Sequence, residues 1–318
     1  MERDTELDKG VLAGVGSTTI KKLKDAGLIT LIEIAVTPPL EIVSRTGMTI
    51  ETAKKVTTLA LKSLSMYKTA EEYHEERLLT VKRITTGSKK LDGILGGGIE
   101  SGVITELIGE FGASKSQICY TLSVLTQLPE DQGGLDGKVL FIDTENTFSP
   151  DRIHQIASTR ELDVHKIMSG IHIVRAYNSQ HQEQIIRDLP IKLQEGNYKL
   201  IILDSAISHY RGEFVGRGTL AERQQNISSF LGNLLRVAES FNLAVVITNQ
   251  VQGNASGFGA PWKPTGGHVM AHAGTHRVHL RKGREGKRIA KIIDSPYLPE
   301  NEASFLITEK GIVDIAED

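Results

Sequence analysis

Apolar residues in this chain gather in short continuous runs, and the segments between these runs carry apolar residues at helical spacing. A continuous apolar run bounded by polar residues predicts a strand that is buried on both faces of a parallel sheet. Helices between such strands cover the faces of the sheet, as in α/β domains. The predicted strands are 103–108, 138–143, 171–175, 199–204 and 243–250. We therefore expect residues 81–318 to form an α/β core with a mainly parallel sheet.

Residues 1–64 are expected to form a second, smaller domain that is wholly helical. It contains Gly14-Val15-Gly16 between two predicted helices, which resembles the helix–hairpin–helix module. In that module the tight turn and the following helix N-terminus present backbone N–H groups to a DNA phosphate, so Gly14 and Gly16 are candidate DNA contacts. The alternative is a protein-contact domain whose lysines form a solvated face. These lysines are Lys21, Lys22 and Lys24.

Residues 65–80 link the two domains without a proline or a glycine. Tyr67 and Ala70, an aromatic and a small residue three positions apart, are candidates for a contact between subunits. On this interpretation they enter pockets on a neighbouring subunit while the backbone adds a strand. The alternative is that they cap the preceding helix.

The segment 109–117 follows the first predicted strand and precedes a helix, which is the layout of a phosphate-binding loop. In the pattern G-x-x-x-x-G-K-[ST], backbone N–H groups surround a triphosphate, the lysine reaches its oxygens, and Ser or Thr binds Mg²⁺. Ser114 stands where the pattern has its second glycine, so a strand–turn–helix that happens to carry a lysine is the alternative. The residues expected to bind ATP are Gly109, Glu110, Phe111, Gly112, Ala113, Ser114, Lys115, Ser116 and Gln117.

Two other predicted strands end in carboxylates at the same edge of the sheet. Asp204 is expected to hold Mg²⁺ together with Ser116. Glu145 is predicted to be the general base, because a carboxylate beside the γ-phosphate can polarise an attacking water, and Lys115 completes the catalytic set. The alternative role for Glu145 is helix capping. Asp143 is expected to be structural.

Two further residues are candidates for contact with the nucleotide. Gln250 follows the strand 243–250, where its amide can contact the γ-phosphate and signal its presence to the next loop. The alternative is an ordinary exposed loop residue. Arg152 begins the helix after Glu145 and is expected to lie over the adenine ring.

Two polar, glycine-rich segments leave C-terminal strand ends, and both are predicted to bind single-stranded DNA. Flexible loops with cationic and aromatic side chains suit the phosphates and stacked bases of a single strand. The segments are 211–225 and 251–267. The cations expected to contact DNA are Arg211, Arg217, Arg223 and Lys263.

His268, His272 and His276 repeat at i, i+4 spacing, which on a helix would resemble a metal site. No carboxylate or cysteine completes the set, so pairing with phosphates or loop backbone is the preferred interpretation. The basic turn 281–288 is predicted to be a solvated hairpin between two strands, and an auxiliary contact with DNA is the alternative.

Composition narrows the possible classes of function. The chain has 318 residues, of which 39% are hydrophobic, and this is enough for a sizeable core. The formal net charge of −2 argues against a uniformly basic DNA-binding protein, so any DNA contact must come from local patches. One cysteine, Cys119, excludes an internal disulfide and is expected to pack in the core. Without an apolar span or a signal-peptide pattern, we expect a cytoplasmic, nucleoid-associated protein that has no membrane partner.

These motifs together resemble the archaeal RadA branch of the RecA-like strand-exchange recombinases, and the resemblance covers nearly the whole chain. It rests on Gly14-Val15-Gly16, Tyr67-Lys68-Thr69-Ala70, 109–117, Asp143-Thr144-Glu145, Leu203-Asp204-Ser205, 216–225, Thr248-Asn249-Gln250, Gly266-Gly267-His268 and 294–300. It implies a RecA-like ATPase core that uses ATP and Mg²⁺. It also implies a helical filament or ring of subunits that exchanges strands between single-stranded and double-stranded DNA, helped by recombination mediators. Asp294 and Pro296 would then cap the ATP of a neighbouring subunit.

The chain departs from this family pattern at four positions. Ser114 and Asn146 replace glycines, Ser149 replaces a basic residue, and Tyr67 replaces a phenylalanine. The two changes at the nucleotide site make the rate of hydrolysis uncertain. A weakly or non-hydrolysing paralogue that acts as a recombination mediator is therefore the alternative function. A DNA-anchored scaffold that uses only the N-terminal domain is a third interpretation, and the intact Lys115, Glu145 and Asp204 argue against it.

Overall fold

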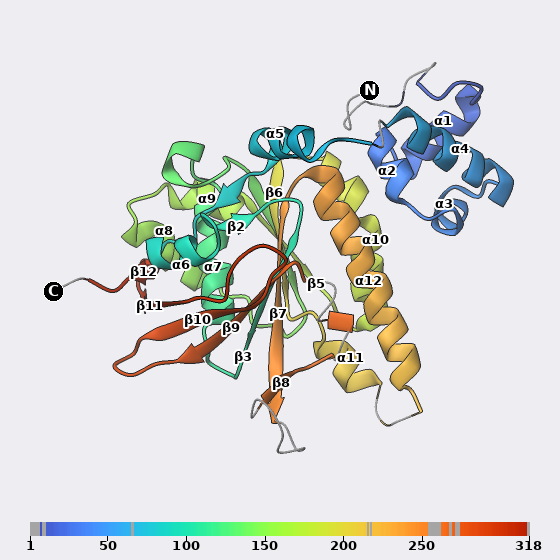
Figure 1. Cartoon of the computed structure of the whole chain (residues 1–318). Helices are drawn as coiled ribbons and strands as arrows, with labels where there is room; N and C mark the ends of the chain where they lie inside the picture. Colours follow the sequence, from blue (N-terminus) through green and yellow to red (C-terminus); the bar gives the residue numbers. More distant parts are fainter. Residues whose placement is uncertain are drawn as a thin grey trace. The chain divides into compact units, whose positions relative to one another are not determined.

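The computed structural model describes residues 7, 11–64, 67–214, 216, 218–253, 262–266, 269–270 and 274–316, without the side chains of 252–253 and 262–263 (Figure 1). The chain divides into two units. The first comprises Met1–Thr80 and Asp188–Glu195, and the second comprises Val81–Arg187 and Gly196–Asp318.

A large mixed sheet organises the second unit. Its strand order is β12-β11-β10-β9-β3-β7-β6-β4-β5, and β8 pairs with the end of β7. Strands β9, β3, β7, β6, β4 and β5 run parallel to one another, whereas β10, β11 and β12 extend the sheet by antiparallel pairing. The bounds are β3 Ile104–Gly109, β4 Lys138–Asp143, β5 Ile171–Arg175, β6 Tyr198–Asp204, β7 Ala244–Gly253, β8 Trp262–Pro264, β9 His276–Lys282, β10 Arg288–Asp294, β11 Glu302–Thr308 and β12 Gly311–Asp314. The predicted α/β core with a mainly parallel sheet is confirmed.

Register brings the C-terminal ends of four parallel strands to one edge of this sheet. Gly109 of β3 lies opposite Gln250 of β7, and Asp143 of β4 lies opposite Asp204 of β6. Strands β6 and β7 are also neighbours, with Leu203 opposite Ile247. Because loops at this edge of an open α/β sheet form the usual ligand crevice, the polar residues that end these strands define the candidate site.

Helices cover both faces of the sheet. Figure 1 shows α10 and α12 on one side of the central strands and α6 to α9 on the other. Their bounds are α6 Lys89–Ile94, α7 Lys115–Leu125, α8 Pro150–Thr159, α9 Val164–Ser169, α10 Ser179–Gln194, α11 Ser208–Glu213 and α12 Leu220–Phe241. Two short strands, β1 Arg83–Ile84 and β2 Ile99–Glu100, form a separate antiparallel pair, and a 3-10 turn spans Glu130–Gln132.

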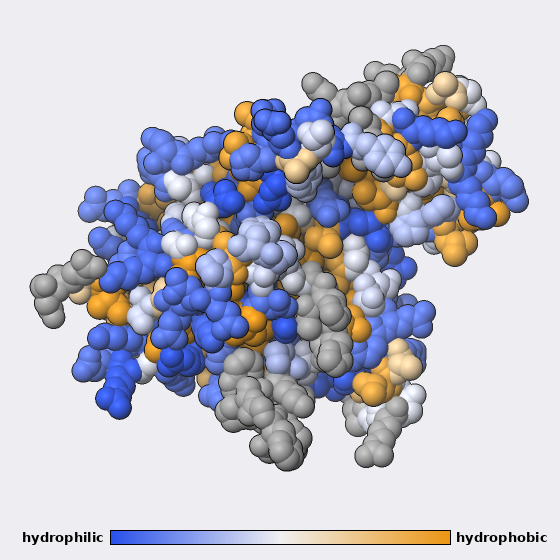
Figure 2. Space-filling view, in the orientation of Figure 1, coloured by the Kyte–Doolittle hydropathy of each residue, from blue (hydrophilic) through white to orange (hydrophobic). Residues whose placement is uncertain are grey.

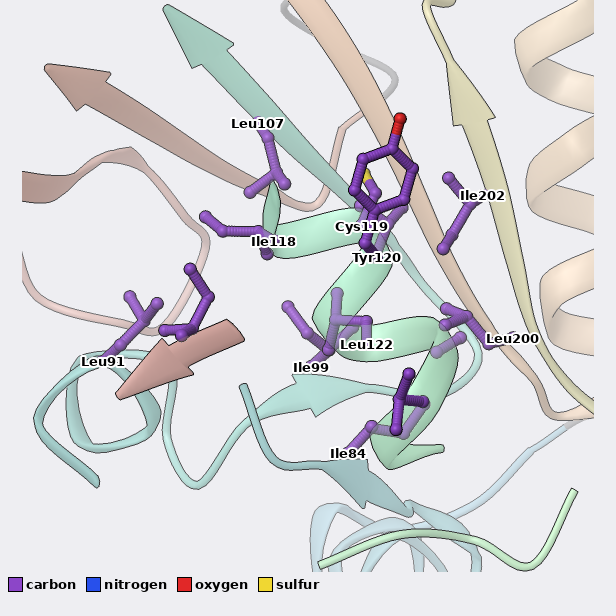
Figure 3. Close-up of a cluster of buried hydrophobic side chains, with 14 of the residues drawn as sticks. Ile84, Leu91, Ile99, Leu107, Ile118, Cys119, Tyr120, Leu122, Leu200 and Ile202 are labelled. Atoms are coloured by element: carbon purple, nitrogen blue, oxygen red, sulfur yellow. The ribbon is translucent and has the colours of Figure 1, made fainter. Parts of the chain in front are cut away.

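Helix α7 begins at the phosphate-binding loop and is buried from Ile118 to Leu125. Figure 3 shows Ile118, Cys119 and Tyr120 of this helix packed among apolar side chains from the neighbouring strands. Cys119 is fully buried, and burial raises the pKa of its thiol well above the ordinary value. The prediction that Cys119 packs in the core is therefore confirmed.

A buried charge network joins three adjacent strands of the sheet. The Nε of Arg277 donates to Oε2 of Glu106 at 2.7 Å, and Nδ2 of Asn249 donates to Oε1 of Glu106 at 2.7 Å. The exposed fraction of Glu106 is 0%, and burial raises the pKa of its carboxyl above the ordinary value despite the opposing effect of Arg277. A charge buried to this extent is tolerated because it is paired and hydrogen-bonded.

The first unit contains the last part of α10 and the helices α1 Ser17–Asp25, α2 Leu31–Val36, α3 Pro39–Thr46, α4 Ile50–Ser63 and α5 Ala70–Thr80. Thr30 and Glu33 form a capping box at the start of α2, and Thr49 caps α4. Apolar residues from α1 to α4 form their own core, which includes Leu23, Leu31, Ile34, Ile42 and Val56.

The surface is largely polar in the view of Figure 2, where hydrophilic side chains cover most of the second unit and apolar ones form small groups. Scattered apolar residues are ordinary on a protein surface. No helix in the described part of the chain combines the length and the apolar character needed to cross a membrane.

Candidate functional site

The phosphate-binding loop lies between β3 and α7, and close packing requires its first glycine. A Cβ on Gly109 would lie 2.5 Å from the carbonyl oxygen of Leu280 and 2.9 Å from Cβ of Ala113. Gly112 has a φ of +74°, which an L side chain rarely adopts. The loop leads directly into the N-terminus of α7, and the backbone N–H groups of a helix N-terminus can bind an anion.

Lys115 closes over this loop. Its Nζ donates to the carbonyl oxygens of Gly109 at 2.8 Å and of Glu110 at 3.0 Å. Burial lowers the pKa of Lys115 from its ordinary value, whereas the nearby carboxylates of Asp204 and Glu145 raise it. The ammonium group is thus held at the phosphate loop by acceptors that a phosphate oxygen can replace.

Ser114 adopts the left-handed conformation that the missing glycine would favour, with φ 92° and ψ 10°. Its hydroxyl makes no capping hydrogen bond to α7. Instead, Nε of Arg288 donates to Oγ of Ser114 at 2.9 Å. The substitution therefore combines a strained backbone with a hydrogen bond that glycine cannot make.

Ser116, in the first turn of α7, contacts Asp204 at the end of β6. The Ser116 hydroxyl donates to Oδ2 of Asp204 at 2.6 Å, and the Thr248 hydroxyl donates to Oδ1 at 2.5 Å. Asp204 is buried, and this burial raises the pKa of its carboxyl above the ordinary value. Hydroxyl and carboxylate oxygens fit Mg²⁺, which is usually bound by one or two protein groups together with phosphates and water.

The described residues contain no group of three or more His, Cys, Asp or Glu side chains that could hold a metal ion. His276 lies in β9, so the helical arrangement of a metal site, which was not the preferred interpretation of the three histidines, does not occur at this residue. Its ring contacts Ser295 and Tyr297 instead, at 3.1 and 3.0 Å. His268 and His272 lie outside the described residues.

Glu145 is exposed at the end of β4 and is oriented by two donors. The Ser205 hydroxyl donates to Oε1 of Glu145 at 2.9 Å, and Nε2 of Gln250 donates to the same oxygen at 3.3 Å. A guanidinium N–H of Arg211 donates to Oε1 of Gln250 at 3.0 Å. The structure thus joins the proposed base, the proposed γ-phosphate sensor and a proposed DNA contact in one chain of hydrogen bonds.

Asp143 shapes the turn that carries Glu145. Its carboxylate accepts from the backbone N–H groups of Glu145, Thr147 and Phe148 at 3.0 to 3.3 Å. Asn146 sits in this turn with φ 57°, and asparagine tolerates that conformation better than most residues other than glycine. The replacement of glycine at this position is therefore compatible with the turn.

Arg152 is fixed between α7 and the end of β11. Its Nε donates to Oε1 of Gln117 at 2.9 Å, and a terminal nitrogen donates to the carbonyl oxygen of Thr308 at 2.5 Å. Burial lowers the pKa of its guanidinium from the ordinary value. These contacts place it beside Gln117 of the phosphate loop, and its stacking on adenine stays a prediction.

The other predicted contacts are spread over the chain. Arg223 lies on α12, and its Nε is buried without a hydrogen-bond partner among the described residues. Asp294 ends β10, with a carboxylate oxygen 4.0 Å from a nitrogen of Arg277, and Pro296 follows it. Gly14 precedes α1 with φ +75°, and Gly16 is its N-cap. Arg217 and the side chain of Lys263 lie outside the described residues.

The candidate subunit contact is open to solvent in the single chain. Tyr67 is 97% exposed. Ala70 begins α5, which Thr69 and Glu72 cap reciprocally, so an extended segment for strand addition ends before Ala70. None of the residues of α5 is buried.

Comparisons with known proteins identify the family of this chain. The family model described as Rad51 matches residues 77–315. The chain belongs to this family. It is 49% identical over 305 residues to the DNA repair and recombination protein RadA of Aeropyrum pernix, covering 95% of each chain. It is 44% identical over 318 residues to the protein of the same name from Cenarchaeum symbiosum, covering 98% of this chain and 80% of that protein.

Three polar residues at this site were not predicted individually from the sequence. Thr248 and Ser205 were seen only as neighbours of Gln250 and Asp204 in two motifs. Arg288 was placed in a solvated hairpin, because its partner Ser114 lies 174 positions away. The presence of Ser114 in place of the glycine of the pattern was the only sequence feature that pointed to an additional contact in this loop.

Proposed function

We propose that this protein is an ATP-dependent DNA strand-exchange recombinase that acts in homologous recombination and DNA repair as a filament on single-stranded DNA. The observation that carries the proposal is the convergence of Lys115, Ser116, Asp204 and Glu145 at the ends of adjacent strands. The full-length similarity to proteins named for DNA repair and recombination supports it.

Each residue of the proposed nucleotide site has a separate role. The loop N–H groups and Lys115 bind the phosphates, and Ser116 and Asp204 would hold Mg²⁺. Bound Mg²⁺ would neutralise charge that develops on the phosphate oxygens. Glu145, held by Ser205, orients and polarises the attacking water. Arg152 would lie over the adenine ring. Asp294 and Pro296 would cap the ATP of a neighbouring subunit.

Gln250 is proposed to connect the nucleotide to DNA. It donates to Glu145, accepts from Arg211, and directly precedes the segment 251–267 that is predicted to bind DNA. Its backbone oxygen also accepts from both the N–H and the hydroxyl of Thr265, which lies near the other end of that segment. A γ-phosphate that attracts the Gln250 amide would therefore act on both ends of this DNA-binding segment.

Arg217→Ala together with Arg223→Ala should weaken binding of single-stranded DNA and flatten its dependence on salt. Each lost phosphate contact should reduce the slope of log K against log salt concentration by about one unit. Fluorescence anisotropy with a labelled oligonucleotide at several salt concentrations measures this slope. Arg236→Ala on the same helix as Arg223 is the control, and an unchanged slope in the double variant would remove both arginines from the DNA site.

Tyr67→Ala combined with Ala70→Glu should convert large assemblies of this protein into small species. Removing an aromatic anchor from an interface typically costs about 2 kcal/mol or more. Because Tyr67 is almost fully exposed in the single chain, the unfolding temperature of the subunit should not change. Light scattering measures the assemblies, and Tyr73→Ala on α5 is the control. Persistence of the large species would refute the proposed contact.

The N-terminal unit is proposed to be a helix–hairpin–helix domain that contacts DNA backbone through Gly14 and Gly16. The positive φ of Gly14 and the open space around both glycines support this role, because a phosphate can approach their N–H groups. Binding of this kind would not depend on base sequence.

Hydrolysis of ATP in the presence and absence of single-stranded DNA tests the proposal. We expect single-stranded DNA to accelerate turnover. The mediator alternative is not favoured by the two RadA relatives, and it predicts ATP binding with little turnover under either condition. Failure to bind ATP would contradict both.

A further inference from the structure

The hydroxyl of Ser114 is used differently from those of other serines at helix N-termini in this chain. Ser88 and Ser149 have negative φ values, and each accepts a hydrogen bond from a backbone N–H in the first turn of its own helix. Ser114 has φ 92° and makes no such bond. A serine in the left-handed region is strained and cannot cap its helix, so something else must fix this residue.

Arg288 supplies that contact from the other side of the phosphate loop. It is the first residue of β10, and one terminal nitrogen donates to the carbonyl oxygens of Gly286 at 2.8 Å and Lys287 at 3.1 Å. These two carbonyls hold the guanidinium in one orientation, and its Nε then donates to Oγ of Ser114. A planar guanidinium with several donors suits such a bridge, which an ammonium group would not reproduce.

The β9–β10 hairpin, which spans 276–294, carries some cations that pair with carboxylates and, among the residues that the structure describes, others that do not. Arg281, Lys287 and Lys291 pair with the carboxylates of Glu302, Glu285 and Glu300, respectively. In the described part of the chain, no carboxylate lies within 4.0 Å of the charged group of Lys282 or Arg288.

These two cations lie opposite each other in the hairpin and beside the phosphate loop. Lys282 and Arg288 are partners in the register of β9 and β10. Nζ of Lys282 lies 3.1 Å from where a Cβ on Gly112 would be, and Arg288 contacts Ser114. The hairpin therefore presents two positive charges that have no carboxylate partner among the described residues to both ends of the segment 112–114.

We propose that Arg288 is a positioning residue of the nucleotide site, which holds Ser114 in the left-handed conformation so that the loop keeps the shape that binds a nucleoside di- or triphosphate. Lys282 adds a second positive charge beside Gly112 of the phosphate-binding loop. The inference rests on the proposed binding of ATP. The contribution of Arg288 to nucleotide binding should therefore depend on the residue at position 114. A glycine at this position adopts the left-handed conformation without a hydrogen bond from Arg288.

Binding of Mg-ATP and Mg-ADP to the full chain, measured by isothermal titration calorimetry, tests this dependence. Arg288→Met should weaken binding of both nucleotides by about tenfold, which corresponds to about 1.4 kcal/mol. The same substitution in a Ser114→Gly background should weaken binding by less than about twofold, because the hydrogen bond is no longer needed. Ser114→Ala, which keeps the Cβ but loses the hydroxyl, should match Arg288→Met, and combining the two should add little further loss.

Arg281→Met is the matched control, since it removes a charge from the same hairpin that pairs with Glu302. It should change nucleotide binding by less than about twofold. An equal loss for Arg288→Met with serine or glycine at position 114 would overturn the inference, and so would no loss with serine. If the unmodified chain binds no ATP, the proposed function itself fails. If the unmodified chain binds ATP but Arg288→Met has the same effect with serine or glycine at position 114, only the inference about Arg288 fails.

Discussion

Replacing Glu145 by glutamine will lower DNA-stimulated ATP turnover by about 100- to 10,000-fold, the usual contribution of a general base, while Mg-ATP still binds. Glutamine keeps the shape of the side chain and can still accept from Ser205, but it cannot take a proton from water. Phosphate release under saturating ATP measures turnover, and a fluorescent ATP analogue measures binding.

Glu130→Gln provides the control for this experiment. Glu130 is an exposed carboxylate that pairs with Lys82. Its substitution should leave turnover within about twofold of the unmodified protein. A Glu145→Gln protein that keeps more than about one tenth of the normal rate would show that another group activates the water.

Arg277→Met will destabilise the second unit by about 3–5 kcal/mol, because it leaves the carboxylate of Glu106 buried without its charged partner. The free energy of unfolding from urea titration measures this effect. Arg281→Met is the control on the same strand, and its exposed ion pair with Glu302 should contribute less than about 1 kcal/mol.

The destabilisation should also depend on pH. Burial already raises the pKa of Glu106 in the folded protein above its ordinary value of 4.5, and Arg277 opposes this rise. Without Arg277 the pKa rises further, so the folded variant retains a proton that the unfolded chain has released. The variant therefore loses stability relative to the unmodified protein as pH rises above the ordinary pKa of a glutamate.

A second substitution separates this explanation from simple loss of packing. Glu106→Gln in the Arg277→Met background removes the buried charge and keeps an oxygen that can accept from Asn249. It should restore at least about half of the lost stability and abolish the pH dependence. If the single variant is no less stable at high pH, Glu106 is not the cause.

The parallel strands were predictable because each is a continuous apolar run that ends in polar residues. The predicted bounds of 138–143 and 171–175 agree with β4 and β5. Strands β11 and β12 were not predicted. In β11 buried residues alternate with more exposed ones, and β12 has only 4 residues, so neither is a continuous apolar run. The i, i+4 spacing of the histidines was a weak guide to structure, since His276 lies in a strand of the sheet.

The position of the candidate nucleotide-site residues at strand ends was predictable, and the contacts that hold these residues were not. Glu145 and Asp204 follow predicted strands, so topology alone brings them to the phosphate loop. The pairs Glu106–Arg277 and Ser114–Arg288 join residues 171 and 174 positions apart. No local pattern encodes such pairs, because register between distant strands brings them together.

Strand exchange tests the central claim most directly. A single strand coated with this protein is mixed with a homologous duplex whose strands carry a fluorescent donor and acceptor, in the presence of Mg-ATP. We predict separation of the labels that requires homology and ATP and is abolished in Lys115→Ala. Separation that is absent under all these conditions, or that occurs equally with Lys115→Ala, would contradict the assignment as an ATP-dependent recombinase.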